Sequence, residues 1–279
     1  MNELLSYFKM ARPVNAIMTG IAIALGFWLS RNTLPLPGFV LLIIAGICAT
    51  AFGNVINDMK DVATDRISHP QRPLPRGELS LAAVWGYLIF LAISALGSSL
   101  FVSKTHAIAT FFPLLLLSVY TLYLKGTPLF GNILVSLLVA YALLFGGLTA
   151  PLFSRLLLPA TLAFTLNLIR EIIKDLQDEP GDRAAGIATT ARLPLPVIRI
   201  TLFSLCVLYL LLLFLPSITG QFGLTYALIC AVVIVPMHCC WIFLFIRKDR
   251  NVRLRLLSLL IKGEMLAGLA ALALDQLIG

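Results

Sequence analysis

The segment NVINDMKDVATDRISHPQRPLPRG, residues 54–77, is the most polar stretch of an otherwise apolar chain. It follows directly on a long apolar run. Four oxygen-bearing side chains stand in it at positions i, i+1, i+4 and i+8: Asn57, Asp58, Asp61 and Asp65. If the helix of the apolar run continues through them, these side chains gather on one face near its end. The spacing predicts a cluster of oxygen ligands.

A basic, proline-rich loop follows these acids. It carries Arg66, His69, Arg72 and Arg76 among Pro70, Pro73 and Pro75. Because proline interrupts a helix and restricts the residue before it, we expect the loop to fold back over the acidic face. Carboxylates beside arginines are suited to a metal-bound phosphate.

A second acidic stretch, EIIKDLQDEPGD at residues 171–182, lies far along the chain. Glu171, Asp175, Asp178 and Asp182 stand at i, i+4, i+7 and i+11, which is again one helical stripe. Pro180 and Gly181 predict that the helix ends before Asp182 and leaves that carboxylate in a loop. The alternative is that both groups merely solvate loops between membrane spans. Two clusters that hold more than half of the 13 acidic residues argue against it.

The composition excludes a soluble globular domain. Of the 279 residues 59% are hydrophobic and 12% are charged, whereas soluble domains have roughly 45–50% and 25%. Long apolar runs without a barrel's alternation predict a polytopic, all-α membrane protein.

Nine apolar runs are long enough to be spans, with residue ranges of about 13–30, 38–59, 80–102, 107–123, 132–150, 156–175, 194–215, 222–246 and 256–278. With a cytoplasmic N-terminus, all but Arg31, Lys104 and Arg155 of the 21 Lys and Arg residues fall on the cytoplasmic side. The positive-inside rule therefore predicts this orientation, in the cell membrane, with both acidic clusters at the cytoplasmic face. The same distribution explains the net charge of +8 without nucleic acid.

The loops are too short for a separate domain, so residues 1–279 are expected to form one helical bundle. The acidic clusters end the second and the sixth span, and four intervening spans preserve direction. This predicts two pseudo-repeat halves, about 1–125 and 126–246, followed by a last helix at 256–278. Tyr120 and Lys125 follow the fourth span on the same side. Interfacial anchoring and phosphate binding would explain Lys125 equally well.

The paired clusters favour Mg²⁺, because this ion takes oxygen ligands and is typically held by one or two carboxylates together with substrate phosphates. A diphosphate bridged between them inside an apolar bundle implies a substrate with a long hydrocarbon tail, such as a prenyl diphosphate. The rival interpretation is an ion-coupled transporter, whose carboxylates would lie at the midplane. Here they lie at helix ends on one face, which favours an enzyme.

The segment NDMKDVATDR…RPLPRG resembles the N-D-x-x-D-x-x-x-D signature of the UbiA-type intramembrane prenyltransferase superfamily. EIIKDLQDEPGD resembles that superfamily's second aspartate-rich motif, and its E-x-x-x-D-x-x-D-x-x-x-D form is most like the branch that makes digeranylgeranylglyceryl phosphate for ether lipids. The Arg12–Pro13 start and the motif spacing agree, so the likeness covers nearly the whole chain.

The resemblance implies a bundle around a central cavity with a cytoplasmic cap, and a Mg²⁺-dependent prenyl transfer to a lipophilic acceptor. The implied metal ligands are Asn57, Asp58, Asp61, Asp65, Glu171, Asp175, Asp178 and Asp182, of which Asp61, Asp65, Asp178 and Asp182 are the expected catalytic carboxylates. The implied substrate-binding residues are Arg12, Asn15, Arg66, Arg72, Arg76, Tyr120, Lys125, Arg170 and Lys174.

The acceptor is the least determined part. A lipid phosphate needs a second anion site, and Arg12, Arg170, Lys174 and Arg183 are surplus cations on the cytoplasmic face. Together with the likeness of the second motif to the ether-lipid branch, this favours geranylgeranylglyceryl phosphate as acceptor and geranylgeranyl diphosphate as donor. The alternative is an aromatic acceptor of quinone or chlorophyll-type biosynthesis. Membrane lipids are the other expected partners, and the sequence does not determine an oligomeric state.

Overall fold

The structure, a computed structural model, describes residues 3–124, 126–184, 186–246 and 250–278, and in these ranges it contains helices, turns and loops but no strand. The α-helices are α1 (Glu3–Ala11), α2 (Pro13–Leu29), α3 (Leu36–Lys60), α4 (Val62–Ser68), α5 (Leu81–Val102), α6 (Lys104–Val119), α7 (Phe130–Gly146), α8 (Leu157–Ala184), α9 (Leu195–Leu213), α10 (Leu215–Ile218), α11 (Leu224–Ile229), α12 (Val235–Ile246) and α13 (Arg250–Ile278). Two π-helical turns, Tyr120–Leu124 and Cys230–Ile234, and two 3₁₀ turns, Phe153–Leu156 and Thr190–Arg192, complete the described helical structure.

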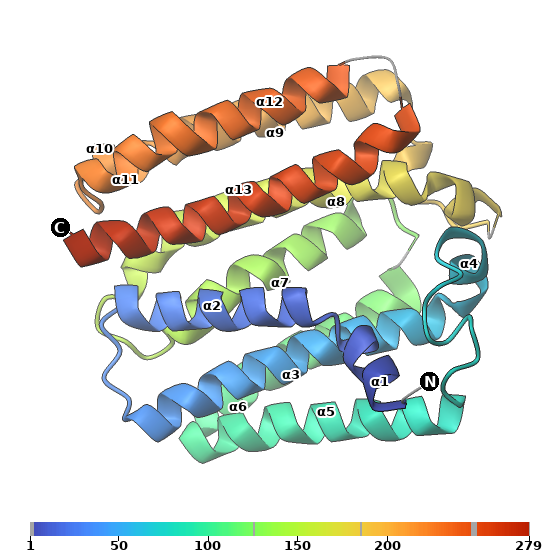
Figure 1. The fold of residues 1–279 in the computed structure, drawn as a ribbon. Coiled ribbons are helices and arrows are strands. Elements are labelled where there is room, and N and C mark those ends of the chain that lie inside the picture. The colour runs from blue at the N-terminus through green and yellow to red at the C-terminus, as the bar shows by residue number, and fades with distance from the viewer. Residues whose placement is uncertain (1–2, 125, 185, 247–249, 279) are drawn as a thin grey trace.

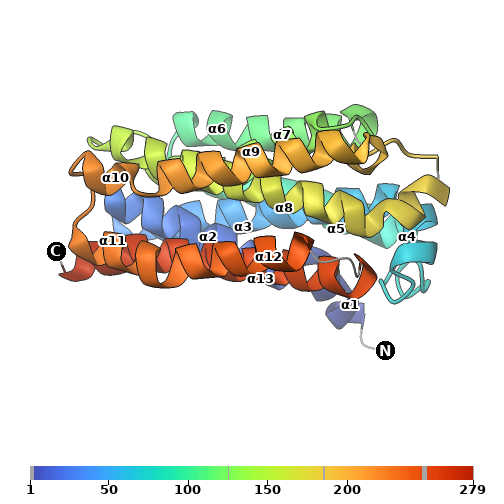
Figure 2. The ribbon, with the colours of Figure 1, turned by 90° about the horizontal axis from the view of Figure 1, so that it is seen from above.

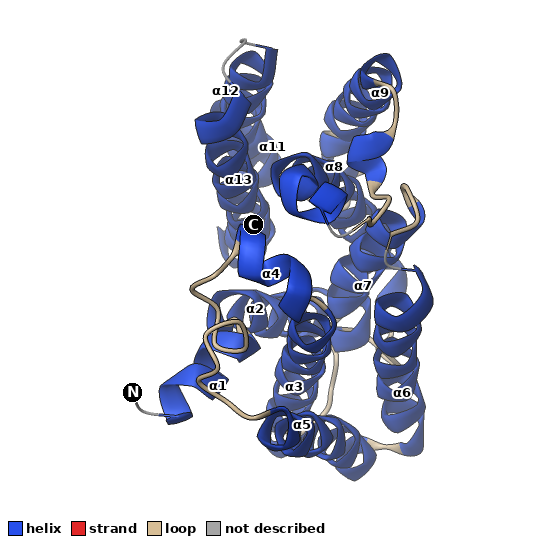
Figure 3. Ribbon diagram, turned by 90° about the vertical axis from the view of Figure 1, so that its right-hand side faces the viewer, coloured by secondary structure: helices blue, strands red, loops and turns tan. Residues whose placement is uncertain are grey.

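The long helices lie side by side along one direction and form an elongated bundle (Figure 1). The view from above shows α12 and α13 on one side and α6 and α7 on the other, with α4 at one end (Figure 2). Seen from that end, α4 lies across the ends of the long helices (Figure 3). The short α4 and the loop after it therefore cover one end of the bundle only.

Each predicted apolar run overlaps helical structure, so the all-helical prediction is confirmed. Seven helices of the described chain are long and apolar enough to cross a membrane, and α1 with α2, bent by 50°, would be an eighth. At 17 residues each, α2 and α7 lie near the lower limit of about 17 residues for a span. The protein is a multi-pass membrane protein, and the number of nine spans stays a prediction.

The outer faces of the helices are apolar and exposed. Phe90 and Phe101 on α5, Ile108 on α6, and Phe203 and Leu211 on α9 all point away from the bundle. Large contiguous apolar surface is rare on soluble monomers. These faces therefore fit contact with lipid tails.

Glycines bring α2 and α7 into very close contact. A Cβ atom built on Gly26 would overlap the carbonyl oxygen of Leu143, and one on Gly146 would overlap that of Ile23. Small residues at helix interfaces allow such an approach of two backbones in membrane proteins. This contact fixes the two helices that carry Asn15 and Asn132 relative to each other.

Two helix boundaries differ from the prediction. The helix of the first cluster does not run straight through: Asp61, with φ −90° and ψ 4°, separates α3 from α4. The helix of the second cluster does not stop at Pro180 but continues to Ala184, so Asp182 is helical and not in a loop. Proline fits helical φ and removes only one N–H donor, so a helix that packs on its neighbours can tolerate it.

Candidate functional site

A cavity of about 600 Å³ lies inside the bundle, between α2, α3, α6, α7, α8, α9 and α13. Apolar side chains make up most of its lining, and polar ones concentrate toward the end covered by α4. The charged residues of its lining are Arg12, Arg72, Arg170, Glu171, Lys174, Lys262 and Glu264. This combination of an apolar body and a cationic end is suited to an amphiphile with an anionic head.

Two arginines neutralise the first acidic cluster. Arg12 stands at the bend between α1 and α2 with a left-handed φ of 51°, and its guanidinium donates to Asp58. Arg72 reaches back from the proline-rich loop and donates to both carboxylate oxygens of Asp65, at 2.6 and 2.7 Å, and more weakly to Asp58 at 3.5 Å. The predicted folding of the basic loop over the acids is confirmed. Burial raises the pKa of Asp65, although Arg72 acts in the opposite direction.

The other members of the first motif lie around the break between α3 and α4. Asn57 lines the cavity and accepts a hydrogen bond from the Thr121 hydroxyl at 2.8 Å, which ties α3 to the π-helical turn. Tyr120 of that turn also lines the cavity. Asp61 occupies the break itself, and its backbone N–H donates to the carbonyl oxygen of Asn57.

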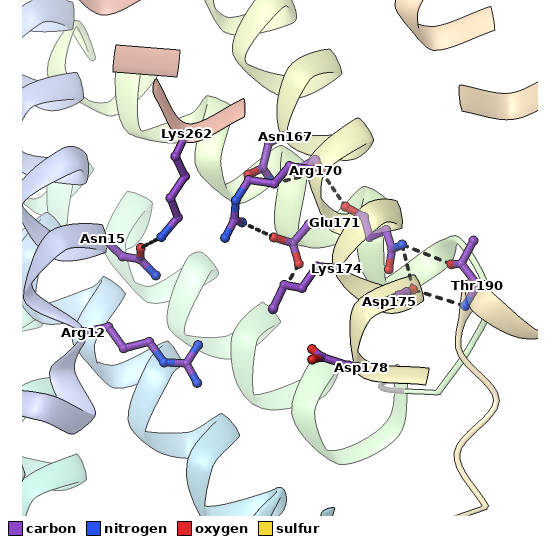
Figure 4. Close-up of polar contacts among 12 residues, drawn as sticks. Arg12, Asn15, Asn167, Arg170, Glu171, Lys174, Asp175, Asp178, Thr190 and Lys262 are labelled. Atoms are coloured by element: carbon purple, nitrogen blue, oxygen red, sulfur yellow. Dashed lines mark hydrogen bonds and ion pairs between the residues drawn. The ribbon is translucent and has the colours of Figure 1, made fainter. Parts of the chain in front are cut away.

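The carboxylates of the second cluster point in different directions. Glu171 faces the cavity and accepts from Arg170 at 2.6 Å and from Lys174 at 3.5 Å (Figure 4). Asp175 faces away from it, and its Oδ2 accepts from the Asn132 amide at 3.0 Å and from the backbone N–H of Thr190 at 3.2 Å. Asp175 therefore joins α8 to α7 and to the chain after α8.

One contact joins the two clusters. His69, in the loop after α4, lies with its Nε2 3.4 Å from Oδ1 of Asp178 on α8. The expectation that the two acidic stretches meet at one end of the bundle is thereby confirmed. Both side chains are about one quarter exposed, which leaves this junction accessible from the covered end.

Several candidates lie away from the cavity. Arg66, Arg76 and Arg183 are exposed and do not contribute to its lining. Arg76 instead lies 3.1 Å from Glu78, and Arg183 lies 3.8 Å from Glu179. The structure therefore does not bring these three arginines to the cavity.

Among the remaining predicted residues, some line the cavity and others do not. Asp182 lies in the last turn of α8 and outside the cavity lining. Arg12, Asn15, Arg170 and Lys174, by contrast, do line it. The predicted Lys125 lies outside the described residues.

Sequence reasoning missed three polar residues of the cavity. Lys262 on α13 donates to Oδ1 of Asn15 at 3.0 Å, and Asn167 on α8 donates to the Ser136 hydroxyl at 3.2 Å. Glu264 on α13 accepts from His238 and Trp241. The available signal was the presence of Lys262 and Glu264 inside an apolar run, where ionisable residues are usually functional.

The donor atoms fit a hard cation that shares its ligands with a substrate. The residues are carboxylates and amides, the oxygen donors that Mg²⁺ prefers. In the described part of the chain, no three His, Cys, Asp or Glu side chains lie close enough to hold a metal ion by themselves. An ion bound here would therefore need phosphate oxygens or water to complete its shell.

Comparison with known proteins identifies relatives of this chain along nearly its whole length. A digeranylgeranylglyceryl phosphate synthase of Korarchaeum cryptofilum is 33% identical over 99% of this chain and 98% of its own length. A solved structure concerned with digeranylgeranylglyceryl phosphate synthase in membranes covers 99% of both chains at 26% identity, with a TM-score of 0.78.

A UbiA homologue from Archaeoglobus fulgidus bound to GPP and Mg²⁺ shares the fold, with a TM-score of 0.67, 18% identity, and coverage of 96% of this chain and 99% of that one. The model of the UbiA prenyltransferase family matches residues 19–263. This match spans most of the cavity-lining helices and both acidic motifs. The chain belongs to the UbiA prenyltransferase family.

Proposed function

We propose that this prenyltransferase transfers a geranylgeranyl group from geranylgeranyl diphosphate to geranylgeranylglyceryl phosphate, in the biosynthesis of ether lipids. The observation that carries the proposal is the charge of the cavity lining, in which five cations and two carboxylates border an otherwise apolar space. Two anionic substrates with long tails would occupy such a space. A full-length relative named digeranylgeranylglyceryl phosphate synthase supports the same activity.

The donor diphosphate would bind at the covered end, between the two acidic clusters. Mg²⁺ would be held there by Asn57, Asp58, Asp61 and Asp65 from one side and by Glu171, Asp175, Asp178 and Asp182 from the other, and would neutralise charge on the leaving diphosphate. A homologue of the same fold binds GPP and Mg²⁺ together. Because Asp175 also accepts two hydrogen bonds from the protein, we infer that it mainly orients the second motif.

The side chains of this protein would orient the reactants. Arg72, fixed by Asp58 and Asp65, would donate to the diphosphate and stabilise it as it leaves. The C1–oxygen bond to the diphosphate breaks, the acceptor's free hydroxyl oxygen forms the new bond to C1, and the hydroxyl proton is released. The apolar lining excludes water, which would otherwise capture the allylic cation.

Aromatic residues of the lining supply a further contribution. Tyr120, Tyr141 and Phe145 border the cavity. Their ring faces can stabilise a positive charge by cation–π attraction, which is worth about 0.5–2 kcal/mol per contact. We assign them this role toward the developing cation.

We also propose the orientation and the architecture that the sequence predicts. These comprise nine spans in the cell membrane, two pseudo-repeat halves, a cytoplasmic N-terminus, and a cytoplasmic cap formed by the loops after α3 and α8. The concentration of basic residues on one side supports this topology. A cysteine introduced at Gln71 would react with an impermeant thiol reagent from the cytoplasmic side only; reaction from outside would overturn the orientation.

The proposed activity is tested with purified protein, Mg²⁺ and radiolabelled prenyl diphosphates of several lengths. Geranylgeranylglyceryl phosphate, 4-hydroxybenzoate, dihydroxynaphthoate and homogentisate are offered separately. We expect a product only from the glyceryl phosphate, and most of it from the C20 donor. If only an aromatic acceptor gives a product, the proposed lipid acceptor is wrong. The chain would still be a prenyltransferase.

A further inference from the structure

Lys262 is a cation inside the bundle, and no acid among the described residues forms an ion pair with it. It lies on α13, lines the cavity, and reaches across to α2, where its Nζ donates to Oδ1 of Asn15 at 3.0 Å (Figure 4). In the described part of the chain, no carboxylate oxygen lies within 4.0 Å of this ammonium group. A neutral amide oxygen satisfies one N–H of Lys262 but not its charge.

Other cations near Lys262 add to the positive charge of this part of the cavity. Arg170, Lys174 and Arg12 repel Lys262, whereas Glu171 attracts it. Glu171, however, already accepts from Arg170 and Lys174, so one carboxylate serves two other cations. A partly buried excess of positive charge is costly unless an anion joins it.

Arg170 provides a second, independent sign of a missing anion. Its side chain is only 14% exposed, and its Nη1 donates to Glu171 at 2.6 Å. Its Nε is buried and has no hydrogen-bond partner. Buried N–H donors are nearly always satisfied in folded proteins, by protein groups, water or ligands. An unpaired guanidinium donor at a cavity that also contains Lys262 points to a bound anionic group.

We propose that Lys262, Asn15 and Arg170 bind the phosphate group of the acceptor. This inference rests on the proposed function, because it assigns the second of its two anionic substrates. The donor diphosphate requires carboxylates for its metal, and these lie near Arg72 and on α8. The hydrogen-bond partner of Lys262 is an amide and not a carboxylate, which suits a phosphate monoester that binds without metal. Lys262 and Arg170 would neutralise it, and the amide N–H of Asn15 would donate to it.

The site would give the enzyme its selectivity between acceptors. A phosphate dianion would satisfy the free donors of both cations, whereas an uncharged alcohol would leave them unpaired. Sites built for a charged or polar group reject analogues that lack it more strongly than apolar pockets reject a missing methylene. Selectivity for a phosphorylated acceptor would therefore depend on Lys262.

The test pairs one substitution with one change of substrate. The variants are Lys262→Met and Lys262→Arg, with Arg255→Met as the matched control, because Arg255 is an exposed cation of the same helix and does not line the cavity. Each is assayed at saturating donor with geranylgeranylglyceryl phosphate and with geranylgeranylglycerol, which lacks the phosphate. Thermal unfolding verifies that each variant is folded.

In Lys262→Met we expect kcat/KM for the phosphorylated acceptor to fall by about 10- to 100-fold, the loss typical of a charge-assisted hydrogen bond. The value for the alcohol and the KM for the donor should change by less than about threefold. Lys262→Arg should retain most of the selectivity, and Arg255→Met should resemble the parent.

Three outcomes would overturn the assignment. An equal loss with both acceptors would give Lys262 a structural role, a raised donor KM would assign it to the diphosphate, and unchanged selectivity would exclude it from the phosphate site. If the parent enzyme makes no product from geranylgeranylglyceryl phosphate, the proposed function itself fails. That result is distinct, because it appears before any variant is assayed.

Discussion

The two acidic clusters have similar spacing in the sequence but different surroundings in the structure. In the first, a break at Asp61 separates the long α3 from the short α4, and arginines from other parts of the chain hold Asp58 and Asp65. In the second, one unbroken helix carries all four acids. Cations from that same helix hold Glu171. The cations that hold the first cluster thus come from distant parts of the chain, whereas those that hold Glu171 come from its own helix.

The acids of the second cluster share one stripe of α8, because offsets of four, seven and eleven residues keep them within about 60° of one another around the helix axis. Their different partners therefore come from the elements that pack on successive turns of α8. Glu171 faces the cavity, Asp175 contacts α7, and Asp178 contacts the loop that contains His69. Acids in one sequence motif can therefore differ in role, and substitutions can separate these roles.

The largest effect is expected from Asp61→Asn and from Asp178→Asn. Each change removes a charge from one of the two sides that would bind the metal and the diphosphate, so turnover should fall by about 100-fold or more. Glu179→Gln is the matched control for Asp178, because Glu179 is its neighbour and pairs with Arg183 outside the cavity. Full activity of either aspartate variant at matched expression would contradict a site shared by the two clusters.

The next largest effect is expected from Arg72→Met. The change leaves Asp58 and Asp65 short of a cation in a partly buried place, so turnover should fall by about 10- to 100-fold and the thermal midpoint should drop. Lys60→Met is the control, since Lys60 is exposed in the same motif. If the two variants have the same turnover and the same thermal midpoint, the interaction of Arg72 with the first cluster contributes to neither activity nor stability.

Asp175→Asn should affect stability more than activity. An amide at this position weakens acceptance from the Asn132 side chain and the Thr190 N–H, and the free energy of unfolding should fall by about 1–3 kcal/mol. Thermal unfolding in detergent measures this change, with Asp178→Asn as the comparison. A larger loss of stability in Asp178→Asn would reverse the roles assigned within the second cluster.

His69→Gln should have the smallest effect. It removes the 3.4 Å contact with Asp178, a partly exposed pair worth about 0–1 kcal/mol. We expect turnover to fall no more than about fivefold. A loss as large as that of Asp178→Asn would mean that His69 acts in the chemistry and does not merely hold the loop in position.

Much of the fold could be predicted because helices in a membrane follow directly from apolar length. Every apolar run overlaps helical structure, since backbone groups in lipid must be satisfied internally. The helix breaks were harder to predict. Pro180 does not end α8, which continues to Ala184. By contrast, α3 ends at Asp61, although residues 54–68 contain neither proline nor glycine. Tertiary packing decides such boundaries, and it leaves no local signal.

The candidate site was predictable in its acids and less so in its cations. Regular spacing identified Asn57 and Glu171, which both line the cavity. Arg76 looked equivalent to Arg72 in the loop, but only Arg72 turns inward. Lys262 lies far from both motifs, and its contact with Asn15 depends on how α13 packs on α2. Long-range contacts of this kind do not follow from local spacing.

The central claim is that both clusters bind one diphosphate through Mg²⁺. Binding of a non-transferable thiodiphosphate analogue of the donor, measured by calorimetry on the parent, Asp61→Asn, Asp178→Asn and the double variant, tests it most directly. We predict Mg²⁺-dependent binding to the parent, a large loss in each single variant, and little further loss in the double variant. Binding that is independent of Mg²⁺, or losses that add up in the double variant, would contradict a single shared site.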